Sequence, residues 1–135
     1  MNQAQAEQAL SAAKSKAQAL GRQVSIVVVD SHGELVAALR LDGAPYVTAE
    51  MARGKAMVAA IFGRPSAIVA NEPAAAASTH QKIDNWHGNR LVFAQGAVPV
   101  RVDGELIGAV GAGGAPGPDD EAISTAGVEA ISLKA

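Results

Sequence analysis

The sequence predicts an α+β fold of helices and five strands, with antiparallel hairpins, in a single domain of 135 residues. Two observations predict it. First, apolar runs rich in valine are joined in pairs by tight turns that contain glycine, as in antiparallel hairpins. Second, the expected order of elements is α-β-β-α-α-β-β-β-α, which does not alternate strand and helix as a parallel βαβ sheet would.

The N-terminal part predicts a helix followed by the first hairpin. Alanine and leucine recur at helical spacing over residues 3–20, and Gly21 stands where a C-terminal cap is expected. Residues 24–30 are a continuous β-branched run, typical of a strand with both faces buried. The tight turn 31–33 then leads into a partner strand at 34–40.

The middle of the chain predicts two helices and an irregular segment. Thr48 can cap a helix that continues through Phe62, and Ser66 can cap a short third helix that fails before Pro73. Residues 71–90 are the least regular part, and we interpret them as a helix followed by a loop.

The C-terminal part predicts three strands and a last helix. A strand is expected at 91–94, ahead of a hairpin whose turn, Asp103-Gly104, suits the positive φ angles of type I′. The second strand of this hairpin loses its side chains toward Gly114, so that another backbone or a ligand can approach it closely. The last helix begins at residues 118–121.

Composition argues against several classes of partner. The formal net charge is −2, and Lys and Arg are scattered, which disfavours nucleic acid. The absence of cysteine excludes disulfides, thiolate metal ligands and a cysteine nucleophile. Neither a signal-peptide pattern nor a run of about 20 apolar residues occurs, so we expect a cytoplasmic protein without membrane contact.

Small apolar residues also suggest self-association. Hydrophobic residues make up 49% of the chain but aromatic residues only 3%, so the apolar content is mainly alanine and valine. Each of these side chains buries little area, and a homo-oligomer would supply the burial that a monomer lacks. An alanine-rich monomer of modest stability is the alternative.

Several short motifs follow one another from Val27 to the C-terminus. They are Val-Val-Asp30-x-x-Gly33, Arg40-x-Asp42-Gly43-Ala44, Ala52-x-x-Lys55-Ala56 with Phe62 and Pro65, Val98-Pro99, Asp103-Gly104, Gly108-x-x-Gly111 and Asp120-Glu121. In this order they resemble the GlcG/HbpS-like family, the haem-binding or haem-degrading domain also found at the C-terminus of PduO-type proteins. The resemblance implies a profilin-like five-stranded sheet, assembly into tetramers, hexamers or octamers, and haem as a ligand.

Lys55 is the first candidate for a functional side chain. It lies on the apolar stripe of the predicted second helix, so its ammonium needs a carboxylate partner or a path to solvent. The natural partners are Asp30, Asp120 and Glu121. Such an ion pair would be structural; in the alternative, Lys55 binds a substrate carboxylate or a haem propionate.

The irregular segment holds the remaining candidates, His80, Trp86, His87 and Arg90. On a helix the two histidines would stand two turns apart, too far to share one metal ion, so we expect no metal site made by protein side chains alone. Either histidine could be an axial haem ligand or a general base, with Trp86 as an apolar wall and Arg90 binding a carboxylate. Ordinary loop histidines, and Trp86 as an oligomer anchor, are the alternatives.

Two functions are open. The first, which the resemblance implies, is a homo-oligomer that binds haem or a similar flat hydrophobic anion. The second is a cofactor-free enzyme or accessory factor of isomerase, lyase or hydrolase type, which acts on a small organic acid by proton transfer. Its base would be His87 or His80 and its carboxylate clamp Arg90, Arg40 or Lys55. The other expected ligand-binding residues are Gly111 and Gly113 in the glycine-rich strand and Glu121 in the last helix.

Overall fold

Two β-hairpins build the sheet of the computed structural model, which describes residues 1–132. The first consists of β1 (Ser25–Asp30) and β2 (Leu35–Arg40), and the second of β3 (Ala97–Val102) and β4 (Glu105–Gly113). β1 and β4 pair antiparallel in the middle, which gives the order β2-β1-β4-β3. The α+β class and both hairpins are confirmed.

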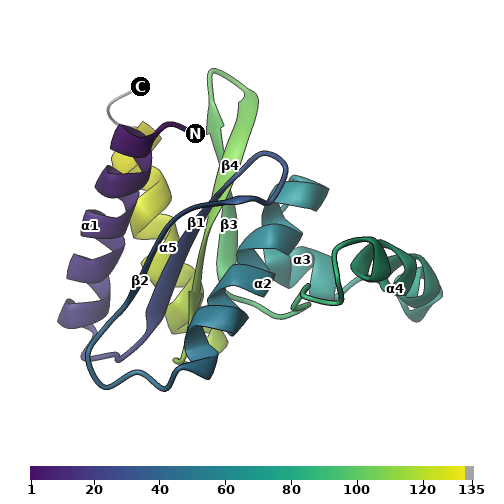
Figure 1. Ribbon diagram of the computed structural model, residues 1–135, viewed down its shortest axis with the longest axis horizontal. Helices are drawn as coiled ribbons and strands as arrows, with labels where there is room; N and C mark the ends of the chain where they lie inside the picture. Colours follow the sequence, from purple (N-terminus) through teal and green to yellow (C-terminus); the bar gives the residue numbers. More distant parts are fainter. Residues whose placement is uncertain (133–135) are drawn as a thin grey trace.

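Helices cover both faces of this sheet (Figure 1). One face packs against α1 (Gln3–Ala19) and α5 (Gly117–Ser132), and the other against α2 (Val47–Phe62). Alternate β1 side chains enter the two layers, Ile26 and Val28 on the α1/α5 side and Val27 and Val29 on the α2 side. The continuous apolar run in β1 is therefore explained by burial on both faces.

The turn of the second hairpin has the backbone conformation that its sequence predicts. Asp103 has φ 52° and Gly104 has φ 80°, so both central residues occupy the region that a type I′ turn requires. This geometry fixes the register in which β3 pairs with the glycine-rich β4.

A short helical segment projects beside α2 from the rest of the molecule. We call the sheet together with α1, α2 and α5 the body. After α3 (Ser66–Ala70) come the 3₁₀ turn η1 (Ala74–Ala76) and α4 (Ala77–Trp86), with α4 standing away from the sheet at the right of Figure 1. We call residues 71–90 the arm. Neither η1 nor α4 contains a buried residue.

The strand expected at residues 91–94 is wrong, and the described residues contain four strands rather than five. The backbone of residues 91–94 instead makes hydrogen bonds to residues that are close in the sequence. The Leu91 N–H donates to the Asp84 side chain at 2.9 Å, and the Ala94 N–H donates to the Val92 carbonyl at 3.0 Å. The Leu91 side chain is buried against Met57, Val58 and Val69, so the apolar run covers α2 and α3 rather than joining the sheet.

Among residues 1–132, no helix combines the length and the apolar character that crossing a bilayer would require.

Candidate functional site

The glycine-rich strand is covered by α2. A Cβ at Gly111 would lie 2.4 Å from the Ala52 carbonyl oxygen, and one at Gly113 would lie 2.9 Å from the Thr48 carbonyl oxygen. Both glycines are buried. Of the two expected approaches, by another backbone or by a ligand, the described structure contains the first, since these glycines let a helix lie close on the sheet.

Lys55 lies in a buried ion pair with Asp120. Its Nζ is 3.0 Å from Asp120 Oδ2 and donates to the Ala112 carbonyl at 3.2 Å, and the two side chains are only 4% and 1% exposed. The other Asp120 oxygen accepts the Ala115 N–H at 3.2 Å. Burial raises the pKa of Asp120 above its usual 3.8, and the Lys55 ammonium opposes that rise.

Backbone at Gly96 closes the surroundings of this pair. A Cβ at Gly96 would lie 2.9 Å from Lys55 Nζ and 3.0 Å from Asp120 Cβ. Lys55 therefore holds α2 to the end of β4 and to the first turn of α5. The structural alternative foreseen for this lysine matches these contacts, with Asp120 as its partner.

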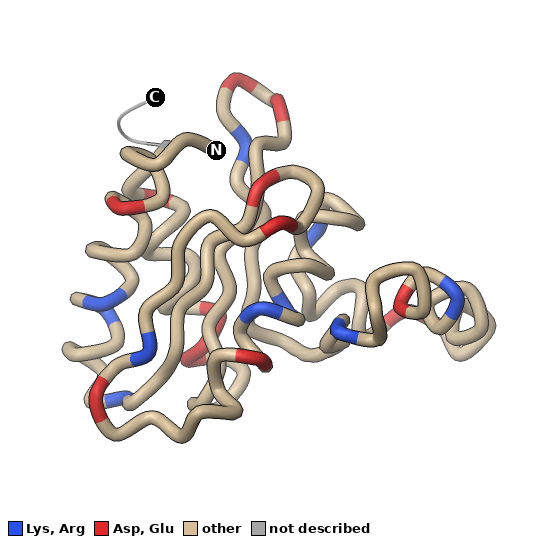
Figure 2. Tube along the Cα trace, viewed as in Figure 1, with Lys and Arg blue, Asp and Glu red and all other residues tan. Residues whose placement is uncertain are grey.

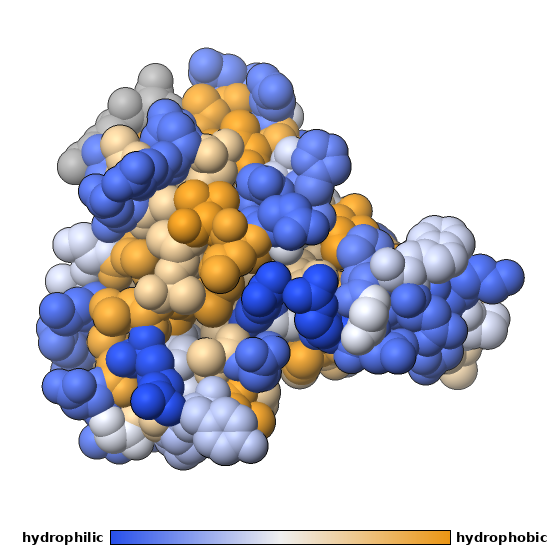
Figure 3. All heavy atoms as spheres, viewed as in Figure 1, coloured by the Kyte–Doolittle hydropathy of each residue, from blue (hydrophilic) through white to orange (hydrophobic). Residues whose placement is uncertain are grey.

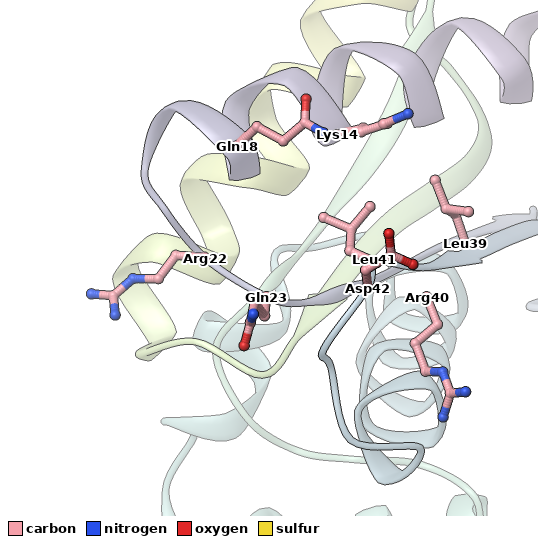
Figure 4. A pocket seen from close by; sticks show the side chains of 8 residues that line it. All are labelled: Lys14, Gln18, Arg22, Gln23, Leu39, Arg40, Leu41 and Asp42. Carbon is pink, nitrogen blue, oxygen red and sulfur yellow. The ribbon is translucent and has the colours of Figure 1, made fainter.

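Arg40 and Glu121 line separate hollows. Arg40 borders one of about 330 Å³ between α1 and β2, where Lys14 and Asp42 contribute opposite charges (Figure 4). The guanidinium groups of Arg22 and Arg40 point to opposite sides, away from the other labelled side chains (Figure 4). Glu121 borders a hollow of about 310 Å³ with Lys16 of α1 and other residues of α5. Neither hollow contains His80, Trp86, His87 or Arg90.

His80 ties the arm to the body. Its ring stacks on Phe93 with centroids 5.0 Å apart and meets the Phe62 ring edge-on at 5.3 Å. Its Nε2 lies 3.2 Å from Glu72 Oε2, and Glu72 also pairs with Arg64. Because the carboxylate accepts, Nε2 carries the proton, and its contacts with Glu72, Phe62 and Phe93 give His80 a structural role in attaching the arm.

His87, which caps the C-terminal end of α4, presents its Nε2 differently. Its Nδ1 lies 2.8 Å from the Ile83 carbonyl oxygen. Because a carbonyl can only accept, Nδ1 carries the proton and the Nε2 lone pair of the neutral ring is left for another group. Metal-binding histidines are commonly fixed in this way, with one ring N–H on a carbonyl and the other nitrogen on the metal.

Trp86 adds an apolar surface next to His87. It is 71% exposed and lines a mainly apolar hollow of about 240 Å³ on α4, together with Ser78, Thr79, Lys82 and Ile83. The hollow is smaller than the roughly 300–1,000 Å³ of ordinary ligand pockets, so it forms one wall of a site rather than an enclosure.

Arg90 follows in the loop, and its Nε donates to the His87 carbonyl at 3.2 Å. The arm thus contains Trp86, His87 and Arg90, of which Arg90 contacts the His87 backbone while Trp86 lines the hollow on α4. Arg40, Lys55, Gly111, Gly113 and Glu121 lie on other elements. Among residues 1–132, no three histidine, aspartate or glutamate side chains form a group that could hold a metal ion. A metal bound at His87 would need its remaining ligands from its own prosthetic group.

Arg53 is a candidate that sequence reasoning missed. It lies on α2 beside Gly54, where a Cβ would come 2.5 Å from the Arg90 carbonyl oxygen and 2.4 Å from Val92. The loop after the arm therefore crosses α2 at Gly54. A glycine inside an alanine-rich helix was the available signal, because it costs helix stability and often marks a close approach.

Comparisons with known proteins agree on one family. The family described as haem degrading protein HbpS-like matches residues 1–129. The chain is 31% identical to protein GlcG of Escherichia coli K12 over 117 residues, which covers 82% of this chain and 79% of GlcG. A double mutant of Streptomyces reticuli HbpS superposes with a TM-score of 0.81 at 29% identity, covering 96% of this chain and 85% of that one. A complex of PduOC with heme superposes with a TM-score of 0.81 at 26% identity, covering 96% and 94%.

Proposed function

The chain belongs to the GlcG/HbpS-like family, and we propose that it binds haem through the arm, with His87 Nε2 as the axial ligand to iron. The observation that carries this proposal is the 2.8 Å contact between His87 Nδ1 and the Ile83 carbonyl, which leaves Nε2 as the ligand atom. The solved heme complex of PduOC supports haem as the group to test first.

The residues around His87 fit a porphyrin. Trp86 offers an exposed aromatic surface for the ring, and Lys82 and Arg90 are cations that could face its carboxylates. When bound, haem would supply an iron centre that could coordinate an imidazole nitrogen, and His87 is the residue that would hold it. The protein side chains would hold the ring, fix the imidazole tautomer and neutralise the propionates.

A titration with hemin tests this function. The wild-type chain should give a saturable, sharp Soret band, and His87→Ala should lower the affinity by at least ~10-fold, the scale seen when the support of a metal ligand is removed. His80→Phe keeps an aromatic ring against Phe93 and serves as the control, with affinity near that of the wild type. A wild-type spectrum identical to that of free hemin would contradict haem binding. A His87→Ala spectrum identical to that of the wild type would show that His87 is not the iron ligand.

The alternative function, an enzyme that acts on a small organic acid, would use His87 and Arg90. Of the bases and clamps expected from the sequence, Lys55 is paired with Asp120 and His80 with Glu72, whereas His87 and Arg90 are joined by a hydrogen bond. They could act as base and carboxylate clamp for a small organic acid. Thermal stabilisation by keto or aromatic acids, lost in His87→Ala and unaccompanied by a Soret band, would favour this reading. A homo-oligomer and a cytoplasmic location remain parts of the proposal.

A further inference from the structure

We propose that Arg53 and Arg90 form a clamp for two carboxylates, the propionates of a porphyrin, at the junction of α2 and the arm. The inference rests on the proposed function for the nature of the ligand, but not on ligation of iron by His87. It adds a residue of the body, Arg53, to a site otherwise made by the arm.

Arg53 has an unsatisfied buried donor. Its side chain is half-buried, and its Nε is buried without a hydrogen-bond partner. Within residues 1–132, no carboxylate oxygen lies within 4.0 Å of its guanidinium. A buried guanidinium nitrogen without an acceptor destabilises a protein, and a carboxylate would satisfy it.

Arg90 is held next to Arg53 by the backbone. Its carbonyl oxygen touches α2 at Gly54, the residue after Arg53. Its Nε is fixed by the His87 carbonyl, and none of its guanidinium nitrogens has a carboxylate within 4.0 Å in the described part of the chain. The two remaining nitrogens of the Arg90 guanidinium are therefore available to a ligand beside His87.

Three other arginines of the chain have partners within the described residues. Arg22 pairs with Asp119 at 2.7 Å, Arg64 pairs with Glu72, and Arg101 donates to the carbonyls of Gly63 and Gly104. Basic residues stand in the middle of α2 and at the base of the arm (Figure 2), and strongly hydrophilic side chains gather at this junction beside apolar surface (Figure 3).

Two guanidinium groups together favour a ligand with two carboxylates. Each has a planar fork of donors that matches the two oxygens of a carboxylate, and a pair can hold two carboxylates at once. Trp86, four residues before Arg90 in the chain, is apolar and mostly exposed. The combination suits a flat apolar molecule with carboxylates at one edge rather than a small polar anion.

Four probes separate the clamp from the iron ligand: hemin, protoporphyrin IX, and the dimethyl ester of each. In the wild type, esterification should weaken binding by about tenfold or more, whether or not iron is present, because charge-assisted hydrogen bonds are lost. Arg53→Met and Arg90→Met should each weaken binding of the free acids while leaving the esters unchanged. His87→Ala should weaken hemin and its ester but not protoporphyrin IX.

Arg101→Met is the matched control, because it removes one exposed positive charge outside the junction. Arg53→Lys keeps the positive charge and should retain part of the preference for the free acids over the esters. Circular dichroism checks that each variant is folded. Equal binding of acids and esters by the wild type, or an unchanged acid preference in both arginine variants, would overturn the clamp. Acid-selective binding of protoporphyrin IX without a hemin Soret shift would support the clamp and reject iron ligation.

Discussion

At the scale of the residue, the buried Lys55–Asp120 pair contributes more to folding than to binding. Both charges are desolvated, and each has the other as its ionic partner, with the Ala112 carbonyl and the Ala115 N–H completing the bonding. Replacing one partner leaves the other charge buried and alone, whereas replacing both with apolar residues removes the desolvation cost as well.

We therefore predict that Lys55→Met lowers the free energy of unfolding by about 3–5 kcal/mol. The double variant Lys55→Met/Asp120→Leu should be more stable than this single variant. Urea unfolding monitored by circular dichroism measures both. A double variant as unstable as Lys55→Met would show that the loss comes from packing and not from an unpaired charge.

The same pair gives a pH dependence with a defined sign. The pKa of Asp120 is raised above 3.8 in the folded state, chiefly by burial, so the folded chain binds this proton more readily than the unfolded chain. Its contribution to stability is full below the unfolded pKa and is lost as pH rises through the folded pKa. On acidification from pH 7 toward 3.8, the stability difference between wild type and double variant should shift in favour of the wild type. A shift in the opposite direction would contradict this assignment.

The partner of Lys55 shows how far residue-scale reasoning can reach from sequence. Helical spacing places the ammonium on an apolar face, and the expected partners are Asp30 at the end of a predicted strand and Asp120 or Glu121 at the start of the last helix. Choosing Asp120 required knowing that α2 packs across the end of β4, where the chain turns into α5, and no local pattern predicts this long-range contact. The role of His80 depends in the same way on where the arm packs, because its ring contacts Phe62 and Phe93, whereas His87 bonds within its own helix.

At the scale of the element, the junction of α2 and the loop after the arm controls the candidate site. Gly54 lies where Arg90 and Val92 cross the helix, and their atoms occupy the space that a Cβ would need. The local preference of a helix for alanine and the tertiary contact therefore oppose each other at this position.

We predict that Gly54→Ala lowers the free energy of unfolding by about 1–3 kcal/mol, as overpacking does elsewhere, although alanine favours a helix. It should also weaken porphyrin binding, because the Arg90 backbone must move. Chemical unfolding and the hemin titration measure the two effects. Adding Val92→Ala relieves one of the two contacts and should restore part of the stability. A Gly54→Ala protein more stable than wild type would show that the loop adjusts freely.

A hairpin can be predicted from sequence more reliably than an extended segment that crosses a helix. Asp103-Gly104 combines turn residues with flanking apolar strands, so the local pattern and the global pairing agree. Residues 91–94 are equally apolar, yet Leu91 is buried and Phe93 half-buried against α2 and α3, and the backbone bonds locally. A short apolar run has no feature that separates a strand from an extended segment covering a helix.

At the scale of the whole molecule, several large apolar side chains are exposed. Trp86 is 71% exposed, Tyr46 77%, Ile68 53% and Leu35 47%. In addition, α4 has ten residues and none is buried, although isolated helices of this length are marginal in water. Both features indicate surfaces that another copy of the chain would cover, and they agree with the small side chains of the core.

We predict that the protein is a homo-oligomer, a tetramer, hexamer or octamer, and that Trp86 contributes to its interface. Light scattering coupled to size exclusion should give a mass well above that of one chain.

Trp86→Lys should lower the mass or make it depend on concentration, because it removes a large apolar contact and adds a charge. Trp86→Phe keeps an aromatic ring and should stay assembled, and Gln81→Lys adds the same charge elsewhere on α4. A wild-type monomer at micromolar concentration would contradict the prediction. An unchanged mass in Trp86→Lys would contradict the role of Trp86 in the interface.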